Sequence, residues 1–368
     1  MKLRRLVAAL LALAVTAYPL QKKKKEEEIT QTLELPKEPP AAVTAETSRL
    51  VFHVSPLTGK GLLSQQVREA LKALQKNVRG ATIVKLRAFV AGSGDLRRVQ
   101  AIVSETFTEK RLPLPALSVV QVGALPLEGA QVVMESIAVA KKAVNSLGLV
   151  FVSGQAVSSE TPLQKVAPLA QKVVADLKTA FRGAGSEPAD ALRVTCFSSS
   201  LEDYPALRAA VETDYRHTAL HFVQLQRGAV RSVVECEAVA GLKRKVSAPV
   251  QFENPPGLPS SADYSQLALV SAPRLVLTGT QIAYGYQDSD ARLAFQRLGK
   301  VLEQGGSSIR DVAVAGFYPL SSSIATQVRR VRFEFFDKSR APASTMLPFE
   351  GLPAMDAGFA VDVIAIAK

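Results

Sequence analysis

Tryptophan is absent from this sequence of 368 residues, and aromatic residues make up only 6% of it. We therefore expect neither an aromatic cage around a large ligand nor a stacking platform for nucleic-acid bases. The three histidines show no ligand spacing with the two cysteines, so neither a metal site nor another cofactor is predicted. No Ser/His/Asp set and no phosphate-binding glycine loop stands out.

The two cysteines, Cys196 and Cys236, lie on predicted strands in the middle of the chain. They could pair in an oxidising compartment. The favoured interpretation is that they are structural thiols.

A signal peptide is predicted at residues 1–17. Lys2, Arg4 and Arg5 precede an apolar run that ends in the small-residue motif V-T-A. The run is shorter than the ~20 residues of a membrane helix. We expect export to the periplasm or the exterior of a bacterial cell and no stable membrane insertion after cleavage; an uncleaved anchor is the alternative.

Residues 18–46 combine charge and proline. Four lysines and three glutamates at 22–28 are followed by three prolines between residues 36 and 40. Such a segment cannot bury apolar area, so we predict a mobile tether over 18–46.

The net charge of +12 falls to +9 (12 − 3) without the three basic residues of the signal. The remaining basic residues form no stripe interleaved with aromatics, so nucleic-acid binding is not expected. A small anionic ligand such as a carboxylate, or an anionic surface, suits this balance.

The rest of the chain repeats one pattern three times. Each copy opens with a short buried strand, at residues 50–55, 149–155 and 275–281. An amphipathic helix follows, at 66–74, 169–181 and 291–304, and then a second strand, at 84–90, 192–197 and 312–317. A second helix follows at 96–107, 204–215 and 324–336. The closing strands are 117–125 with 132–140, 218–225 with 230–240, and 344–349 with 359–367.

A β-α-β-α-β-β unit of this kind is an α/β (α+β) domain with both helices on one face of a small sheet. The other sheet face is also apolar and would be bare in an isolated domain of ~95 residues. We therefore predict that the copies cover one another within a monomeric pseudo-trimer. The predicted boundaries are repeat 1 at 47–142, repeat 2 at 149–245, a Pro-rich linker at 246–271 and repeat 3 at 272–368.

The three copies resemble the RidA/YjgF family, also labelled L-PSP endoribonuclease. The resemblance is carried best by L-V-F-V-S-G-Q at 149–155 and V-V-E-C-E-A-V-A at 233–240. Repeat 1 matches at 124–140, and repeat 3 at 275–281 and 340–352. The resemblance implies a chorismate-mutase-like fold and a trimer with sheets facing inward and ligand clefts between neighbours.

It also implies hydrolysis of reactive enamines and imines to 2-keto acids and ammonia. In the family, an Arg in a P-A-R-[ST] segment grips the substrate carboxylate. The first glutamate of an E-x-E strand positions the attacking water.

Few of these residues are found at the matching positions of this chain. Repeat 1 has Leu117 at the Arg position and Val133 at the water-holding position. Repeat 3 has Ser344 at the Arg position, and Asp362 replaces the glutamate.

Repeat 2 offers Arg216 and Glu235, without the P-A-R-S context. Arg216 either faces the cleft or ends a helix and points into water. The predicted catalytic residues are therefore Arg216, Glu235 and Asp362.

The ends of two opening strands supply the predicted ligand-binding residues. They are Ser153 and Gly154 in repeat 2 and Thr278 and Gly279 in repeat 3. Ser153 and Thr278 could equally be simple strand-end residues.

Three functions are compatible with these residues. The favoured one is a degenerate small-molecule-binding or scaffold protein with largely lost active sites. The alternative is an imine deaminase with a single working cleft at repeat 2. An endoribonuclease, suggested by the family label and the positive charge, ranks last.

Overall fold

The computed structural model describes residues 37–92, 94–163 and 165–368. Repeat 1 consists of β2 (Leu50–Val54), α2 (Leu63–Asn77), β3 (Thr82–Ala91), α3 (Leu96–Glu109), β4 (Ala116–Val122) and β5 (Val132–Val139). Repeat 2 consists of β6 (Leu149–Ser159), α4 (Ala167–Ala184), β7 (Ala191–Ser198), α5 (Tyr204–Glu212), β8 (Ala219–Gln224) and β9 (Ser232–Gly241). Repeat 3 consists of β12 (Arg274–Thr278), β13 (Gln281–Tyr284), α6 (Asp288–Gln304), β14 (Val312–Pro319), α7 (Ser322–Val331), β15 (Ala343–Met346) and β16 (Ala357–Ile366). The predicted order β-α-β-α-β-β is confirmed in all three.

The three sheets share one strand order and one register. In repeat 1 the order is β2-β5-β3-β4, and repeats 2 and 3 follow it as β6-β9-β7-β8 and β12-β16-β14-β15, with β13 also on β16. The parallel pairs align Lys85 with Ala116, Arg193 with Ala219, and Val314 with Ala343. These shared pairings define which positions are equivalent in the three repeats.

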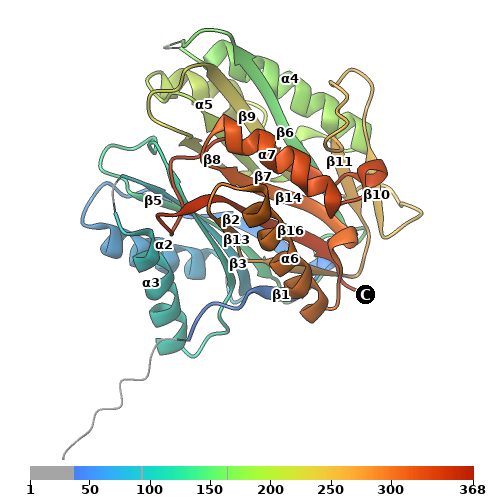
Figure 1. Cartoon of the computed structure of the whole chain (residues 1–368), viewed down its shortest axis with the longest axis horizontal. Helices are drawn as coiled ribbons and strands as arrows, with labels where there is room; N and C mark the ends of the chain where they lie inside the picture. Colours follow the sequence, from blue (N-terminus) through green and yellow to red (C-terminus); the bar gives the residue numbers. More distant parts are fainter. Residues whose placement is uncertain (1–36, 93, 164) are drawn as a thin grey trace, which may run out of the picture. The chain divides into compact units, whose positions relative to one another are not determined.

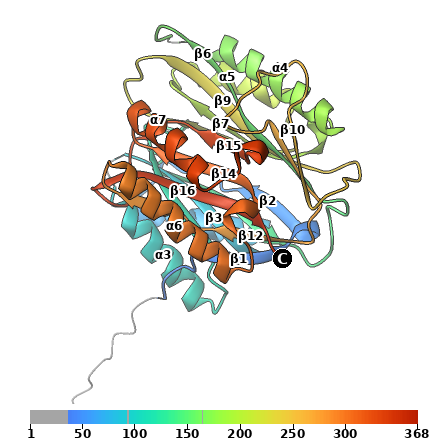
Figure 2. The same cartoon turned by 45° about the vertical axis from the view of Figure 1, so that its right-hand side comes forward.

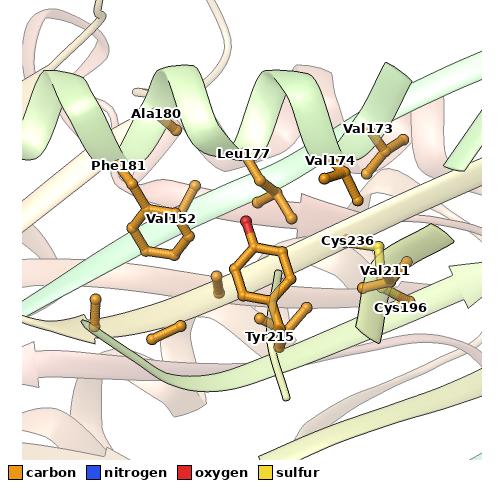
Figure 3. Close-up of a cluster of buried hydrophobic side chains, with 14 of the residues drawn as sticks. Val152, Val173, Val174, Leu177, Ala180, Phe181, Cys196, Val211, Tyr215 and Cys236 are labelled. Carbon is orange, nitrogen blue, oxygen red and sulfur yellow. A yellow bond between two sulfur atoms is a disulfide. The ribbon is translucent and has the colours of Figure 1, made fainter. Parts of the chain in front are cut away.

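Each sheet carries its two helices on one face (Figures 1 and 2). In repeat 2, Leu177 and Phe181 of α4 are buried against the sheet because they recur at a spacing of four on one side of the helix (Figure 3). The helix ends where Gly185 adopts a left-handed conformation with φ of 75°.

Cys196 and Cys236 lie in this same core and form a disulfide (Figure 3). They are directly opposite on β7 and β9, with their Cα atoms 4.2 Å apart. The favoured interpretation of structural thiols was therefore wrong, because the antiparallel register brings the two side chains together.

The helix-free faces of the three sheets are buried against one another. One shared core joins Leu50 and Phe52 of repeat 1 to Phe151 of repeat 2 and to Leu275 and Leu277 of repeat 3. A second joins side chains such as Phe89, Phe197 and Phe349, again one from each repeat. The repeats thus cover the apolar faces that each would expose alone, as the pattern of apolar residues predicts.

Two segments expected outside the repeats are strands. Residues 42–46, assigned to the tether, form β1 (Ala42–Glu46), which pairs antiparallel with β12 of repeat 3. The linker contains β10 (Val250–Glu253) and β11 (Leu267–Val270), and β11 pairs antiparallel with β6 of repeat 2. Alternation of side chains explains both, since β11 sends Ala268 and Val270 into the shared core and Leu267 and Leu269 toward α4.

Most of the predicted tether and the predicted signal at 1–17 lie outside the described residues. Within the described part of the chain, no helix is both long and apolar enough to span a membrane.

We expect the protein to be a monomer in solution, because its own three sheets bury the faces that would otherwise drive trimer formation. Size-exclusion chromatography with light scattering should give the mass of a single chain. A stable homotrimer would contradict this arrangement.

Candidate functional site

The pairing of strands fixes the position of the family's carboxylate-binding arginine in each repeat. The residues at this position are Leu117, Leu220 and Ser344. Each follows an alanine, and the three alanines pair with equivalent positions on β3, β7 and β14, the parallel neighbours of their strands. The expectation that Arg216 fills this position in repeat 2 is therefore wrong, and Leu220 occupies it. Arg216 lies beyond the end of α5 and is exposed to solvent.

Arg216 is also far from Glu235. Glu235 is opposite Phe197, whereas the start of β8 at Ala219 is opposite Arg193. Four residues along β7 correspond to about 13 Å at ~3.3 Å per residue, and Arg216 lies three residues further on. The structure does not bring these two predicted catalytic residues together.

The water-holding position follows from the antiparallel pairs. The residues at this position are Val133, Glu235 and Ala360. Their partners occupy equivalent positions on the second strand of each repeat, namely Phe89, Phe197 and Tyr318. The assignment of Asp362 to this position is shifted by two residues. Asp362 is the counterpart of Glu237 and Glu135, which pair with equivalent positions of the second strands.

Each cleft is built by two neighbouring repeats. Cleft 3–1 brings Gly279 of repeat 3 against Leu117 of repeat 1, cleft 2–3 brings Ser153 of repeat 2 against Ser344, and cleft 1–2 lies between β2 and β8. An arginine and a glutamate acting together would therefore come from different repeats.

In cleft 3–1 the two repeats are in direct contact. Thr280 N donates to Leu117 O at 3.3 Å, and a β-carbon on Gly279 would lie 2.8 Å from the same oxygen. The Thr278 hydroxyl accepts from Val363 N at 2.9 Å, across the irregularity between β12 and β13. The two residues predicted to bind ligand here are thus engaged by the protein itself.

Cleft 2–3 retains one acid at the water-holding position. Glu235 is buried beside Gly154, where a β-carbon would overlap the carboxylate. Burial and then the charge of Glu237 raise the pKa of Glu235 to about 8, and the guanidinium of Arg329 opposes this shift. Glu235 is therefore largely protonated and neutral at pH 7.

A hollow of about 590 Å³ lies next to this part of the cleft, and Glu235 itself is not among the residues that line it. Val233 on β9, Met346 on β15 and the exposed Arg329 on α7 contribute to its wall. This size is within the range of small-molecule pockets, ~300–1,000 Å³. Ser153 does not face a ligand here, because its hydroxyl donates to Ser265 O at 2.6 Å and accepts from Ser344 N at 2.8 Å.

The centre of the molecule, where the three sheets meet, holds a buried ion network. Asp362 accepts from Lys85 Nζ at 2.8 Å and from the hydroxyl of Tyr318 at 3.2 Å, and it also contacts the Ser118 hydroxyl. Burial alone would raise the pKa of Asp362, but the charges of Lys85 and Arg87 hold it below its usual value. Asp362 is thus a partner of buried cations rather than a group in a ligand cleft.

Glu135 and Glu237 bind the other two cations, the buried Arg87 and the partly buried Arg193. Arg87 donates to Glu135 at 2.7 Å and to Glu237 at 2.5 Å, and Arg193 Nη2 donates to Glu237 at 3.1 Å. Arg193 Nη1 is 3.3 Å from Glu135, and His221 Nε2 is 2.6 Å from it. Burial opposes ionisation of Glu135, but Arg193, Arg87 and His221 hold its pKa well below the usual value.

The three acids and the three cations balance in charge. The cavity between them measures about 60 Å³, which is far below the size of a typical ligand pocket. We interpret this centre as a structural network. Within the described residues, no group of acidic, histidine or cysteine side chains could hold a metal ion.

Sequence reasoning missed this network and Arg329. One signal could have found the three acids, since Glu135, Glu237 and Asp362 each stand two residues before a β-branched residue followed by alanine. Alignment of the three closing strands on this β-branched residue and alanine places the three acids at one position. Alignment on the first glutamate of the E-x-E motif instead places Asp362 opposite the wrong residue.

Three fused β-α-β-α-β-β repeats with clefts between neighbours define the class of this protein. Residues 24–140 match the model of the family described as Endoribonuclease L-PSP. The match starts within the predicted tether, in agreement with the finding that β1 is part of the folded chain. No curated protein sequence matches the chain.

Solved structures similar to single repeats come from the YjgF and Rid families. A YjgF-family protein from Neisseria meningitidis is 13% identical, with a TM-score of 0.25, over 32% of this chain and 95% of that one. A Rid-family protein of unknown function from Yersinia pestis is 15% identical, with a TM-score of 0.29, over 32% and 99%. A YjgF-family member from Mycobacterium tuberculosis is 23% identical, with a TM-score of 0.24, over 32% and 99%. The first repeat of the chain is thus similar in sequence to the family described as Endoribonuclease L-PSP.

Replacing Glu135 by glutamine should destabilise the protein by about 3–5 kcal/mol, because Arg87 and Arg193 lose their buried counter-charge. Urea unfolding at pH 7 measures this. The control is Glu105→Gln, which also loses contacts to two arginines but at the surface; it should cost no more than about 1 kcal/mol.

The stabilisation from Glu135 should depend on pH. Because folding lowers its pKa, its contribution is complete above the unfolded value of about 4.3 and is lost as the pH falls toward the folded value. Glu135→Gln should therefore flatten the acid side of the stability profile. An unchanged profile would contradict the ionised state of Glu135.

Proposed function

We propose that this protein binds a small carboxylate ligand in cleft 2–3 and has lost the imine hydrolysis that its family resemblance implies. The observation that carries this proposal is that Leu117, Leu220 and Ser344 stand at all three positions of the carboxylate-binding arginine. A fused trimer can lose two of three sites and remain active, but the loss of all three removes the family's way of holding its substrate.

Cleft 2–3 nevertheless offers two groups suited to an anion. Protonated Glu235 can donate a hydrogen bond to a carboxylate and adds no negative charge at pH 7. Arg329 supplies a guanidinium at the wall of the adjacent hollow, and its charge acts on Glu235. This combination favours a ligand that is small, anionic and able to accept both hydrogen bonds.

Imine hydrolysis in cleft 2–3 is the second candidate. It is favoured by Glu235, which occupies the family's water-holding position and has a pKa near 8, in the range useful for general acid–base catalysis. In that case, Arg329 would replace the missing arginine from a different element. Release of a 2-keto acid from an enzymatically generated 2-imino acid, above the rate without protein, would establish this activity.

Pyruvate should bind to the full chain, and its neutral amide should bind much more weakly. Arg329→Ala should weaken pyruvate binding by about ten- to a hundredfold, since a hydrogen bond to a charged group contributes ~1.5–3 kcal/mol. Isothermal titration calorimetry gives both affinities. Arg216→Ala is the matched control and should bind pyruvate as the wild type does. Loss of binding in that variant would show that Arg216 binds the carboxylate.

Pyruvate binding should also weaken above pH 8. The anion favours the neutral form of Glu235, so each pH unit above its pKa of about 8 should cost up to about tenfold in affinity. Glu235→Gln stays neutral and should remove this dependence. An equal pH dependence in wild type and variant would show that another group is responsible.

We also propose that the chain is exported to an oxidising compartment. The pairing of Cys196 with Cys236 supports this, because disulfides persist in such compartments and are rare in the cytosol. N-terminal sequencing of the protein recovered from the periplasm or medium should begin at Tyr18. Recovery of only the uncleaved chain from the cytosol would contradict export.

A further inference from the structure

The opening strands of the three repeats differ in how their outer edges are covered. In repeat 3, β1 pairs with the outer edge of β12, and in repeat 2, β11 pairs with that of β6. In repeat 1, β5 is the only strand paired with β2 among the described residues. Within the part of the chain that the structure describes, one of three equivalent edges is therefore uncovered.

The two covering strands follow a cyclic rule. Each covering strand comes just before the opening strand of one repeat and pairs with the opening strand of the preceding repeat in the cycle. Thus β1 comes before β2 of repeat 1 and pairs with β12 of repeat 3. Likewise, β11 comes before β12 of repeat 3 and pairs with β6 of repeat 2. By the same rule, a strand before β6 would cover β2. The chain has no room for it, since only nine residues separate the end of β5 at Val139 from Leu149.

A hollow lies where the missing strand belongs. Each covering strand also contacts the second strand of the neighbouring repeat. β1 contacts β3 of repeat 1, and β11 contacts β14 of repeat 3. The third equivalent is β7, and its residues Ala191 and Leu192 line a hollow of about 940 Å³ against β2. The position of the hollow therefore matches the place that a covering strand would take.

The edge of β2 that faces this hollow is suited to pairing. Asn145 Nδ2 donates to the carbonyl of Leu50 at 2.7 Å, in place of a strand N–H group. Because main-chain groups alternate in direction along a strand, those of Phe52 and Val54 point to the same side as those of Leu50. No partner for them occurs among the described residues.

The lining of the hollow indicates the kind of segment that fits. Leu50 and Phe52 are equivalent to Leu149 and Phe151, which β11 covers with Val270 and Ala268. Lys76, His53 and His217 line the hollow, and no acidic residue does.

We propose that the outer edge of β2 accepts an extended peptide segment of a partner protein as an added antiparallel strand. The segment has small apolar residues at alternate positions, facing Leu50 and Phe52, and acidic residues at its flanks. Its main chain pairs with Phe52 and Val54, which provides affinity independent of sequence. Uncovered edge strands are templates for such pairing.

The probe is a blocked peptide, Glu-Glu-Leu-Ala-Leu-Val-Glu-Glu, which carries the β11 sequence between acidic flanks. It should bind to the full chain and slow amide hydrogen exchange at Phe52 and Val54. Fluorescence anisotropy of the labelled peptide gives its affinity. Lys76→Glu should weaken binding by about tenfold, whereas Lys72→Glu, one turn earlier on α2 and outside the hollow, should change it less than twofold.

Val54→Pro tests the pairing itself. It removes the N–H that faces the hollow and leaves the hydrogen bonds to β5 in place, so it should abolish peptide binding without lowering Tm by more than a few degrees. Absence of binding and of exchange protection at millimolar peptide would overturn the proposal. Slow exchange at Phe52 and Val54 without peptide would also overturn the proposal, because the edge would then already be covered. If dilution abolishes this protection, the occupant is a second copy of the chain. If the protection persists on dilution, the occupant is the chain's own N-terminal segment.

Discussion

The bare face of each sheet is the constraint from which the rest of the architecture follows. Two helices cover one side of each repeat, and the other side presents side chains such as Phe52, Phe151 and Leu277. Burying these faces contributes roughly 25 cal/mol per Å² of apolar surface, and only another sheet of matching shape can cover them. Fusion of three repeats in one chain makes that cover intramolecular and independent of concentration.

Facing sheets bring their central residues together, and there the three copies have diverged. All keep an acid at one position, Glu135, Glu237 or Asp362, but the cations come from repeats 1 and 2 only, as Lys85, Arg87 and Arg193. Three identical subunits would place identical residues around the axis. In this chain, Lys85 pairs with the acid of repeat 3 and Arg87 with those of repeats 1 and 2. Such pairing distinguishes the three sheets, because any other arrangement leaves buried charges without partners.

The periodicity of apolar residues was sufficient to predict the order of strands and helices in the three repeats, though not β13, since burial of one face imposes that periodicity directly. It could not predict which strands pair across repeats. Residues 42–46 and 267–270 belong by sequence to the segments before their repeats, yet each completes the sheet of another repeat. Local pattern does not contain that information.

The same limit affected the candidate site. Glu235 was identified because it lies within a short motif. Arg216 was misplaced because only the parallel register of β7 and β8 shows that Leu220 holds its expected position. Arg329 lies more than ninety residues from Glu235 and comes from a helix of the next repeat, so spacing along the sequence carries no sign of it.

A homotrimer must change its three clefts together, whereas a fused chain can change each alone. In cleft 3–1, Gly279 lies against the main chain of Leu117. Cleft 2–3 has kept a buried acid and an adjacent hollow but exchanged the source of its cation. Cleft 1–2 has the apolar Val133 and Leu220 at both polar positions, and no strand of the described residues covers the outer edge of β2. The shared core stays intact throughout, because apolar replacements at cleft positions, such as Val133, are themselves packed within it. The fold can therefore persist while each cleft acquires or loses a role of its own.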